Sequence, residues 1–193
     1  MEEIRETALA YYANLSDKRK KKAKSLFNNM DSNGDGKVIL SEYEKKFKKL
    51  GLSCDIPRNS SLFKEIFQER KTSFFKELDK DEDGTLDFED FITLYYLLRT
   101  GRLLFCSGHE CQVFLKGLFF VCPKCFKKSK KTITLCPTCF SDKNYSHKRS
   151  HVLLDNYAFL MSTQAPKSKW ETTFEVLEIV ANVINAAASC TIM

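Results

Sequence analysis

Two twelve-residue stretches of this chain share one pattern of oxygen-bearing side chains. Loop 1 runs from Asp31 to Glu42, and loop 2 runs from Asp79 to Asp90. Each loop has carboxylate or amide side chains at positions 1, 3 and 5, a glycine at position 6 and a carboxylate at position 12. Oxygen ligands at this spacing, with a glycine for the sharp turn, are the pattern that holds a hard divalent cation. Because the pattern occurs twice, we expect both loops to bind metal.

The expected ligands are side-chain oxygens and, at position 7, a backbone carbonyl. They are Asp31, Asn33, Asp35, Lys37 and Glu42 in loop 1, and Asp79, Asp81, Asp83, Thr85 and Asp90 in loop 2. Position 12 differs between the loops, because Asp90 is one methylene shorter than Glu42 and reaches a metal less easily with both oxygens. We therefore expect loop 1 to be the Ca²⁺ site, and loop 2 to be weaker or to accept Mg²⁺ as well.

Apolar residues at helical spacing flank both loops. They are Ala23, Leu26, Phe27, Met30, Tyr43, Phe47 and Leu50 around loop 1, and Phe74, Phe75, Leu78, Phe91, Leu94, Tyr95 and Leu98 around loop 2. With a helix before and after each loop, residues 16–100 resemble the calmodulin-like EF-hand superfamily. We expect the two hands to pair through a short ribbon, in which Val38 and Leu86 at position 8 are partners. Residues 2–13 are expected to form an additional helix packed on the pair.

The rest of the composition favours an intracellular protein. The first residues are acidic and lack the basic and apolar regions of a secretory signal. No run of about 18 uncharged apolar residues is present. In a reducing compartment the eight cysteines favour metal ligation over disulfides.

Most of the cysteines, and every histidine, lie between residues 106 and 151. Two C-x-x-C pairs, Cys122–Cys125 and Cys136–Cys139, each have a proline directly after the first cysteine. Two thiolates on such a turn can face one ion, and the proline fixes one backbone dihedral of the turn. The further candidate ligands are Cys106, His109, Cys111, His147 and His151. Four ligand pairs in this short segment predict two tetrahedral Zn²⁺ sites. Disulfides, or a single zinc with spare thiols, are the alternatives.

The order of these pairs gives residues 104–156 a resemblance to a ZZ-type zinc finger, with Gly117 and Phe119–Phe120 placed as in that family. The resemblance implies a cross-brace in which alternate pairs share a metal. One zinc is then held by Cys106, Cys111, Cys136 and Cys139, and the other by Cys122, Cys125, His147 and His151. The first pair departs from the C-x-x-C of the family. The spacing from Cys111 to Cys122 matches the family better than the spacing from His109 does, and His109 is the alternative ligand.

The final residues, Cys190-Thr-Ile-Met193, match a prenylation box, and the terminal methionine favours a farnesyl group on Cys190. One lipid alone gives only reversible attachment, so we expect a second contact with the membrane. An apolar stripe from Trp170 to Ala188 and the lysines of residues 18–24 and 127–131 are the candidates. Membrane association at the cytosolic face is therefore expected, with cytoplasm or nucleus as alternatives.

The expected fold class is mainly α: an EF-hand pair with its N-terminal helix over residues 1–101, and a C-terminal helix within the linker and tail of residues 157–193. Between them, residues 104–156 form a small zinc-stabilised, β-containing cross-brace finger. This arrangement is similar to plant-type small proteins that join EF-hands to such a finger.

We expect a non-enzymatic sensor or adaptor that binds Ca²⁺, Zn²⁺ and a protein target. No Ser/His/Asp set, phosphate-binding loop or HExxH helix is present, and a RING-type ligase would have a different fourth ligand pair. Residues 102–151 carry 10 basic and 2 acidic side chains, whereas residues 1–101 carry 19 of each. The alternative is therefore a nucleic-acid-associated zinc protein whose EF-hand pair is structural.

Overall fold

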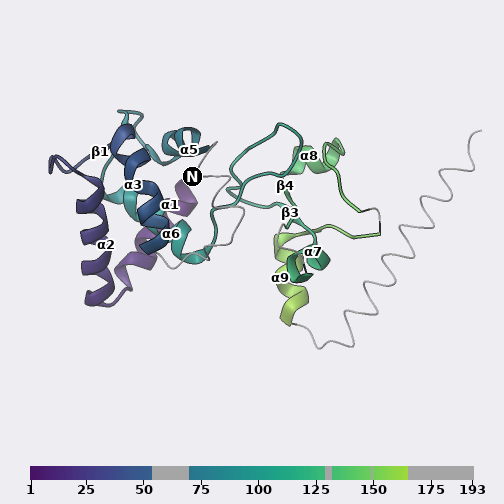
Figure 1. The fold of residues 1–193 in the computed structure, drawn as a ribbon. Helices are drawn as coiled ribbons and strands as arrows, with labels where there is room; N and C mark the ends of the chain where they lie inside the picture. Colours follow the sequence, from purple (N-terminus) through teal and green to yellow (C-terminus); the bar gives the residue numbers. More distant parts are fainter. Residues whose placement is uncertain (54–69, 129–131, 149, 165–193) are drawn as a thin grey trace, which may run out of the picture. The chain divides into compact units, whose positions relative to one another are not determined.

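A computed structural model of the chain describes residues 1–53, 70–128, 132–148 and 150–164, which form two compact units (Figure 1). Unit 1 comprises residues 1–105 and 114–116, and unit 2 comprises residues 106–113 and the described residues from 117 onwards. The described chain is mostly helical with two small antiparallel sheets. This confirms the helical part of the expected fold class and the presence of some β structure.

The helices of unit 1 frame the two loops as the apolar spacing predicts. They are α1 (Glu2–Ala13), α2 (Asp17–Met30), α3 (Leu40–Ser53), α5 (Lys71–Leu78) and α6 (Phe88–Thr100). Between them, β1 (Val38–Ile39) and β2 (Thr85–Leu86) form an antiparallel ribbon that joins the loops. Val38 lies opposite Leu86 in this ribbon, which confirms the predicted partners.

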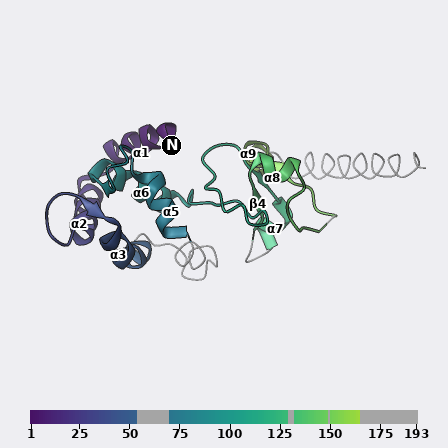
Figure 2. The same ribbon diagram turned by 90° about the horizontal axis from the view of Figure 1, so that it is seen from above.

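Helix α6 is the central element of unit 1. All of its residues from Asp90 to Leu98 are buried. A helix that is apolar on every side must be covered on every side, and α1, α2 and α5 all pack against it. Helix α1 lies along α6 (Figure 2), where Tyr11 contacts the ring of Tyr96 and Tyr12 contacts the ring of Phe88. The additional N-terminal helix is therefore part of the core of the unit.

Unit 2 is built on a three-stranded antiparallel sheet. Its central strand, β3 (Phe120–Val121), pairs with β4 (Thr134–Leu135) on one side and β5 (Leu154–Asp155) on the other. Two short helices, α7 (Pro123–Lys128) and α8 (Pro137–Ser141), each begin directly after the first cysteine of a C-x-x-C pair. Since β3 and β4 each lead into one of these pairs, the sheet sets the spacing between them.

A last helix, α9 (Asn156–Gln164), packs on the same unit. The amide of Asn156 donates to the carbonyl of Phe119 (2.9 Å), and the amide of Phe119 donates to Oδ1 of Asn156 (3.2 Å). The ring of Phe159 meets the ring of Phe126 on α7 with a centroid separation of 5.0 Å. Residues 157–164, assigned to the tail from the sequence, thus belong to a helix that packs against the sheet of unit 2.

Among the described residues, no helix combines the length and apolar character needed to cross a membrane. Several sequence-based expectations concern residues outside the described ranges. These are the prenylation site Cys190, the apolar stripe from Trp170 to Ala188 and the lysines at positions 130 and 131.

Candidate metal-binding sites

Loop 1 is shaped by hydrogen bonds from its own backbone to its ligand side chains. The amide of Gly36 donates to Oδ2 of Asp31 (2.9 Å). The amide of Asp35 donates to Oδ1 of Asn33 (3.2 Å), and the amide of Lys37 donates to Oδ1 of Asp35 (2.9 Å). Gly36 has a φ of 84°, a left-handed conformation that glycine adopts without strain. The side chains at positions 1, 3 and 5 are therefore fixed on one tight turn.

Position 12 of loop 1 closes the same turn. Glu42 is buried, and its Oε1 accepts a hydrogen bond from the amide of Ser32 at position 2 (2.7 Å). Its Oε2 accepts a longer hydrogen bond from the amide of Ile39 (3.2 Å). One carboxylate oxygen thus reaches back across the loop to its first residues, as a ligand for an ion held in the loop must do.

Loop 2 gathers three carboxylates. Oxygen atoms of Asp79, Asp81 and Asp83 lie within 4.8 Å of one another. Oδ2 of Asp79 accepts a hydrogen bond from the amide of Gly84 (2.9 Å), but Oδ1 of Asp79 is buried and has no hydrogen-bond partner among the described residues. A buried carboxylate oxygen without a partner is costly. A divalent cation at this point would satisfy it, so the donor set of loop 2 fits such an ion.

Position 12 of loop 2 accepts the same hydrogen bond from position 9 as position 12 of loop 1, but its second oxygen has a different neighbour. Asp90 and Asp87 form a capping box at the start of α6: the amide of Asp90 donates to Oδ1 of Asp87 (2.9 Å), and the amide of Asp87 donates to Oδ2 of Asp90 (3.4 Å). The other oxygen of Asp90 lies 4.0 Å from Nε of Arg5 on α1. Burial raises the pKa of Asp90 to about 6, and the neighbouring carboxylates of Asp87 and Asp79 add to this shift. The bond from the Asp87 amide and the charge of Arg5 oppose it.

Unit 2 brings the expected zinc ligands into two groups. The first group consists of Cys106, Cys111, Cys136 and Cys139, and the second consists of Cys122, Cys125, His147 and His151. Within each group the candidate ligand atoms lie within 4.8 Å of one another. These are the sets implied by the cross-brace resemblance. All six of these cysteines are free thiols.

The separations within both groups suit a tetrahedral zinc ion. Ligands at the Zn–S and Zn–N bond lengths of such a site lie about 3.8 Å apart for two sulfurs and about 3.5 Å apart for sulfur and nitrogen. Sγ of Cys111 lies 3.8 Å from Sγ of Cys136. Nδ1 of His151 lies 3.5 Å from Sγ of both Cys122 and Cys125. Both clusters are therefore compatible with zinc.

The ring of His109, the alternative ligand of the first site, lies beside Ser146 and not in the first cluster. Its Nε2 lies 3.1 Å from Oγ of Ser146, and it belongs to neither group. The side chain of Asn144 donates to the carbonyl of His109 (3.0 Å) and approaches Sγ of Cys139 (3.7 Å). His109 therefore helps to position the segment beside the first cluster, and it is Cys111 whose Sγ belongs to that cluster.

Two residues that support the first cluster were not identified from the sequence. The amide of Gly108 donates to Sγ of Cys106 (3.3 Å), and a Cβ atom on Gly108 would lie 2.9 Å from Cβ of Cys139 and overlap its Sγ. Asn144 is the second. Such contacts orient metal ligands. The position of Gly108 two residues after a cysteine could have indicated its role, whereas nothing in the local sequence indicates that of Asn144.

Three thiols of the clusters, Cys106, Cys125 and Cys139, are hard to ionise without a cation, whereas the pKa of Cys136 is lowered by hydrogen bonds that outweigh its burial. Burial raises the pKa of Cys139, and the adjacent thiols of Cys111, Cys136 and Cys106 add to the shift. Burial likewise raises the pKa of Cys125. Because zinc binds thiolates, metal uptake at these clusters must release protons and depends on pH.

Comparison with known proteins identifies two motifs within the first unit. The EF hand family matches residues 23–48 and 71–95, which contain loops 1 and 2 with parts of their helices. The chain therefore contains two EF-hand motifs, which confirms the resemblance for these loops and implies calcium binding.

One relative is 1-phosphatidylinositol 4,5-bisphosphate phosphodiesterase eta-2 of Mus musculus, which is 34% identical to this chain over 82 residues. The match covers 42% of this chain and 5% of the mouse protein, so the chain spans only a small part of the length of that relative. No solved structure matches the chain.

Proposed function

We propose that this protein is a non-enzymatic, calcium-responsive sensor or adaptor. The EF-hand pair takes up Ca²⁺, with loop 2 also accepting Mg²⁺. The second unit, stabilised by two zinc ions, presents a surface to a protein target. A farnesyl group on Cys190 directs the protein to the cytosolic face of a membrane. The observation that carries the proposal is the buried oxygen of Asp79, which lacks a partner within an EF-hand loop and which a divalent cation would satisfy.

The connection between the loops supports a sensing role. In EF-hand sensors, ion binding changes the angle between the helices that flank each loop. Here β1 and β2 join the loops, and α6 leaves loop 2 to run through the centre of unit 1. A change at position 12 of loop 2 would therefore be transmitted directly to the core of the unit.

The second unit supports an adaptor role. Apolar side chains that protrude from α7 and α9 are exposed, namely Phe126, Tyr157, Leu160 and Met161. Exposed apolar groups on a small, metal-stabilised scaffold suit contact with a protein. The proposal includes no catalytic activity. His147 and His151 lie in a group that could hold a metal ion, which would leave them unavailable for catalysis. The phosphodiesterase named above is matched over only 5% of its own length.

Calcium titration calorimetry of the full chain tests the sensor. We expect two unequal binding events, the tighter of which is lost in Glu42→Gln because loop 1 then lacks its bidentate ligand. Glu3→Gln, the same charge change on the exposed side of α1, should leave both events in place. Two equal events that survive Glu42→Gln would contradict the assignment of loop 1.

Elemental analysis tests the zinc unit. Protein purified without chelator should contain about two zinc ions per chain, and Cys122→Ser should lower this to about one. Cys54→Ser is the control, because the sequence places that cysteine in no ligand pair. Protein without zinc whose thiols react only after reduction would contain disulfides instead.

The anchor is tested in eukaryotic cells with an N-terminal tag, so that the C-terminal box stays free. The wild-type protein should fractionate with membranes and carry a farnesyl group by intact mass, and Cys190→Ser should be soluble. An unchanged membrane fraction together with an unmodified mass would remove the anchor from the proposal.

A nucleic-acid-associated protein is the second candidate, favoured by the exposed Lys127 and Lys148 of a unit that carries few acidic groups. In that case, retention on RNA or DNA should fall steeply with salt and should be lost when both lysines are replaced by alanine.

A further inference from the structure

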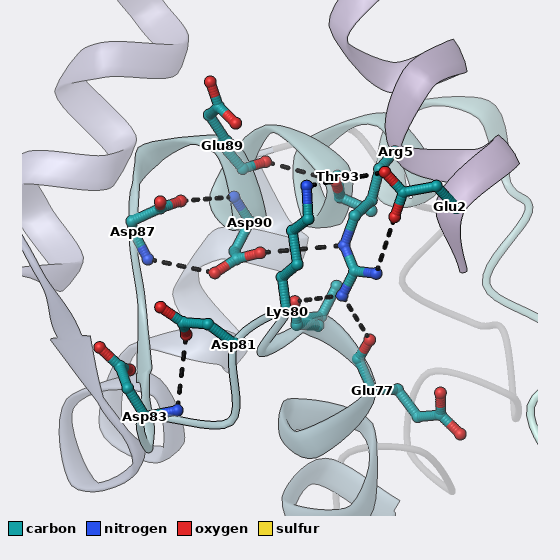
Figure 3. Close-up of polar contacts among 11 residues, drawn as sticks. Glu2, Arg5, Glu77, Lys80, Asp81, Asp83, Asp87, Glu89, Asp90 and Thr93 are labelled. Atoms are coloured by element: carbon teal, nitrogen blue, oxygen red, sulfur yellow. Dashed lines mark hydrogen bonds and ion pairs between the residues drawn. The ribbon is translucent and has the colours of Figure 1, made fainter.

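Helix α1 reaches the start of loop 2 through Arg5 (Figure 3). Nη2 of Arg5 donates to the carbonyl of Leu78 (2.8 Å) and to the carbonyl of Glu77 (3.2 Å). These are the last two carbonyls of α5, and Leu78 immediately precedes the first ligand position of loop 2. A cation is favourable at the carbonyl end of a helix. Arg5 is therefore held firmly where the loop begins.

The same guanidinium group also lies beside the end of loop 2. Its Nε is 4.0 Å from Oδ1 of Asp90, the position-12 carboxylate. Figure 3 shows this carboxylate between the amide of Asp87 and the side chain of Arg5. Both partners are nearly buried, with side-chain exposures of 13% for Arg5 and 7% for Asp90. One nearly buried cation from outside the loop thus donates hydrogen bonds just before the first ligand and faces the last ligand at ion-pair distance, where its Nε has no hydrogen-bond partner among the described residues.

Loop 1 provides the comparison within the same molecule. The carboxylate of Glu42 at its position 12 reaches back to the amide of Ser32. Each position-12 carboxylate also accepts a hydrogen bond from the amide at position 9 of its own loop, so the loops differ only in the second oxygen. The second oxygen of Asp90 faces Nε of Arg5, and Asp90 is not part of the set of close oxygens formed by Asp79, Asp81 and Asp83. One oxygen of the last ligand of loop 2 therefore lies beside a protein cation, whereas both oxygens of the last ligand of loop 1 are held within their own loop.

A second protein cation near loop 2 is less firmly placed. Nζ of Lys37 lies 2.6 Å from Oδ2 of Asp83, but the side chains are 51% and 33% exposed. Exposed ion pairs are weak and are screened by salt. A buried ion pair is different, because removing one partner leaves the other without compensation. Arg5 is therefore the side chain that can hold a ligand of loop 2 against a metal ion.

We propose that Arg5 determines the affinity of loop 2, because its guanidinium group competes with the divalent cation for the carboxylate of Asp90. The inference rests on the proposed binding of a cation by loop 2. An arriving ion must draw Asp90 away from Arg5 and must also overcome the repulsion of a fixed positive charge. By linkage, ion binding at loop 2 and attachment of α1 through Arg5 oppose each other.

The test uses the full chain with Glu42→Gln, so that the remaining calcium event belongs to loop 2. Arg5→Gln is added to this background and compared with Arg19→Gln, an equal charge change at an exposed position on α2. Calcium affinity is measured by titration calorimetry, and the thermal midpoint of the metal-free protein is measured by circular dichroism.

We expect Arg5→Gln to raise the calcium association constant of loop 2 by about tenfold, because a nearby positive charge is removed, and Arg19→Gln to change it less than about twofold. The thermal midpoint of the metal-free Arg5→Gln protein should fall. If Arg5 had only a structural role, Arg5→Gln would lower both the calcium association constant and the thermal midpoint. A rise in the first with a fall in the second therefore indicates competition. An affinity in Arg5→Gln equal to or below that of Arg19→Gln overturns the inference and leaves the proposed function standing. Absence of binding to loop 2 in every variant overturns both.

A second measurement needs no change at Arg5. Hydrogen exchange is followed in the Glu42→Gln protein with and without saturating Ca²⁺. Competition predicts that Ca²⁺ slows exchange in residues 79–90 and speeds exchange in α1 several-fold. Slower exchange in both segments would show that ion binding strengthens the attachment of α1, and it would overturn the inference even if Arg5→Gln does not fold.

Discussion

The ammonium group of Lys37 in loop 1 lies 2.6 Å from Oδ2 of Asp83 in loop 2. Lys37 is position 7 of its loop and Asp83 is position 5 of the other, so a ligand-bearing residue of each loop takes part in the contact. The hydrogen bond raises the pKa of Lys37, and together with Thr85 it lowers the pKa of Asp83 to about 2. This contact therefore favours the folded state above the usual pKa of Asp83, 3.8, and the contribution is lost as pH falls through about 2.

The first prediction concerns this contact between the loops. In the Glu42→Gln background, Lys37→Met should raise the calcium affinity of loop 2 by about two- to threefold at low salt, because an exposed competing cation has been removed. The gain should vanish at about 0.5 M KCl, where exposed charges are screened. Titration calorimetry at both salt concentrations measures the change, and Lys45→Met on the exposed side of α3 is the matched control. A gain that persists at high salt would require a cause other than charge.

The second prediction is a pH dependence of loop 2. The metal-free protein keeps a proton on Asp90 up to about pH 6, mainly because the carboxyl is buried. Since its pKa is raised in the folded state, this group favours folding below pH 3.8, and its contribution is lost as pH rises through about 6. A cation needs the ionised form, so its affinity changes in the opposite direction.

In the Glu42→Gln protein, the calcium association constant should therefore increase by about tenfold from pH 5 to pH 7 and should then level off. Calorimetry in two buffers of different ionisation enthalpy should also detect the release of a proton near pH 6. A flat profile over this range, with no proton released, would show that Asp90 is already ionised before the metal binds.

The EF-hand pair could be predicted because its signals are local. Oxygen ligands and a glycine within twelve residues define each loop, and apolar spacing on both sides defines the helices. The ribbon partners Val38 and Leu86 follow from the equivalence of the loops. The contact between Arg5 and Asp90 could not be predicted in this way. The spacing of α1 indicates that one face is buried, but it does not indicate which distant carboxylate that face meets.

In the second unit, too, some features could be predicted from the sequence and others could not. The eight candidate ligands that the structure groups are recognisable by residue type and pair spacing, and the resemblance supplied the pairing between them. Their supporting contacts depend on how the chain folds around the cluster. Asn144 meets Cys139 because the short helix α8 ends between them, and Gly108 meets Cys139 across the cluster. A single sequence has no local signal for such distances.

The third prediction concerns the choice between Cys111 and His109. Cys111→Ser should lower the zinc content from about two ions per chain to about one, because its Sγ belongs to the first cluster. His109→Ala should leave the content unchanged, since its ring faces Ser146. Elemental analysis after gel filtration compares the two proteins. The reverse result would assign the ligand role to His109.

The last prediction compares two glycines of unit 2. Gly108→Ala places a methyl group against Sγ and Cβ of Cys139, a ligand that cannot move without leaving its cluster. Gly117→Ala meets nothing within 4 Å and serves as the matched control. Gly108→Ala should therefore weaken zinc binding at the first cluster by about tenfold or more, with loss of the metal to a competing chelator, while Gly117→Ala behaves as the wild type. Competition with a chromophoric chelator measures both. Equal zinc retention by the two variants would mean that the close approach of Gly108 to Cys139 does not constrain the site.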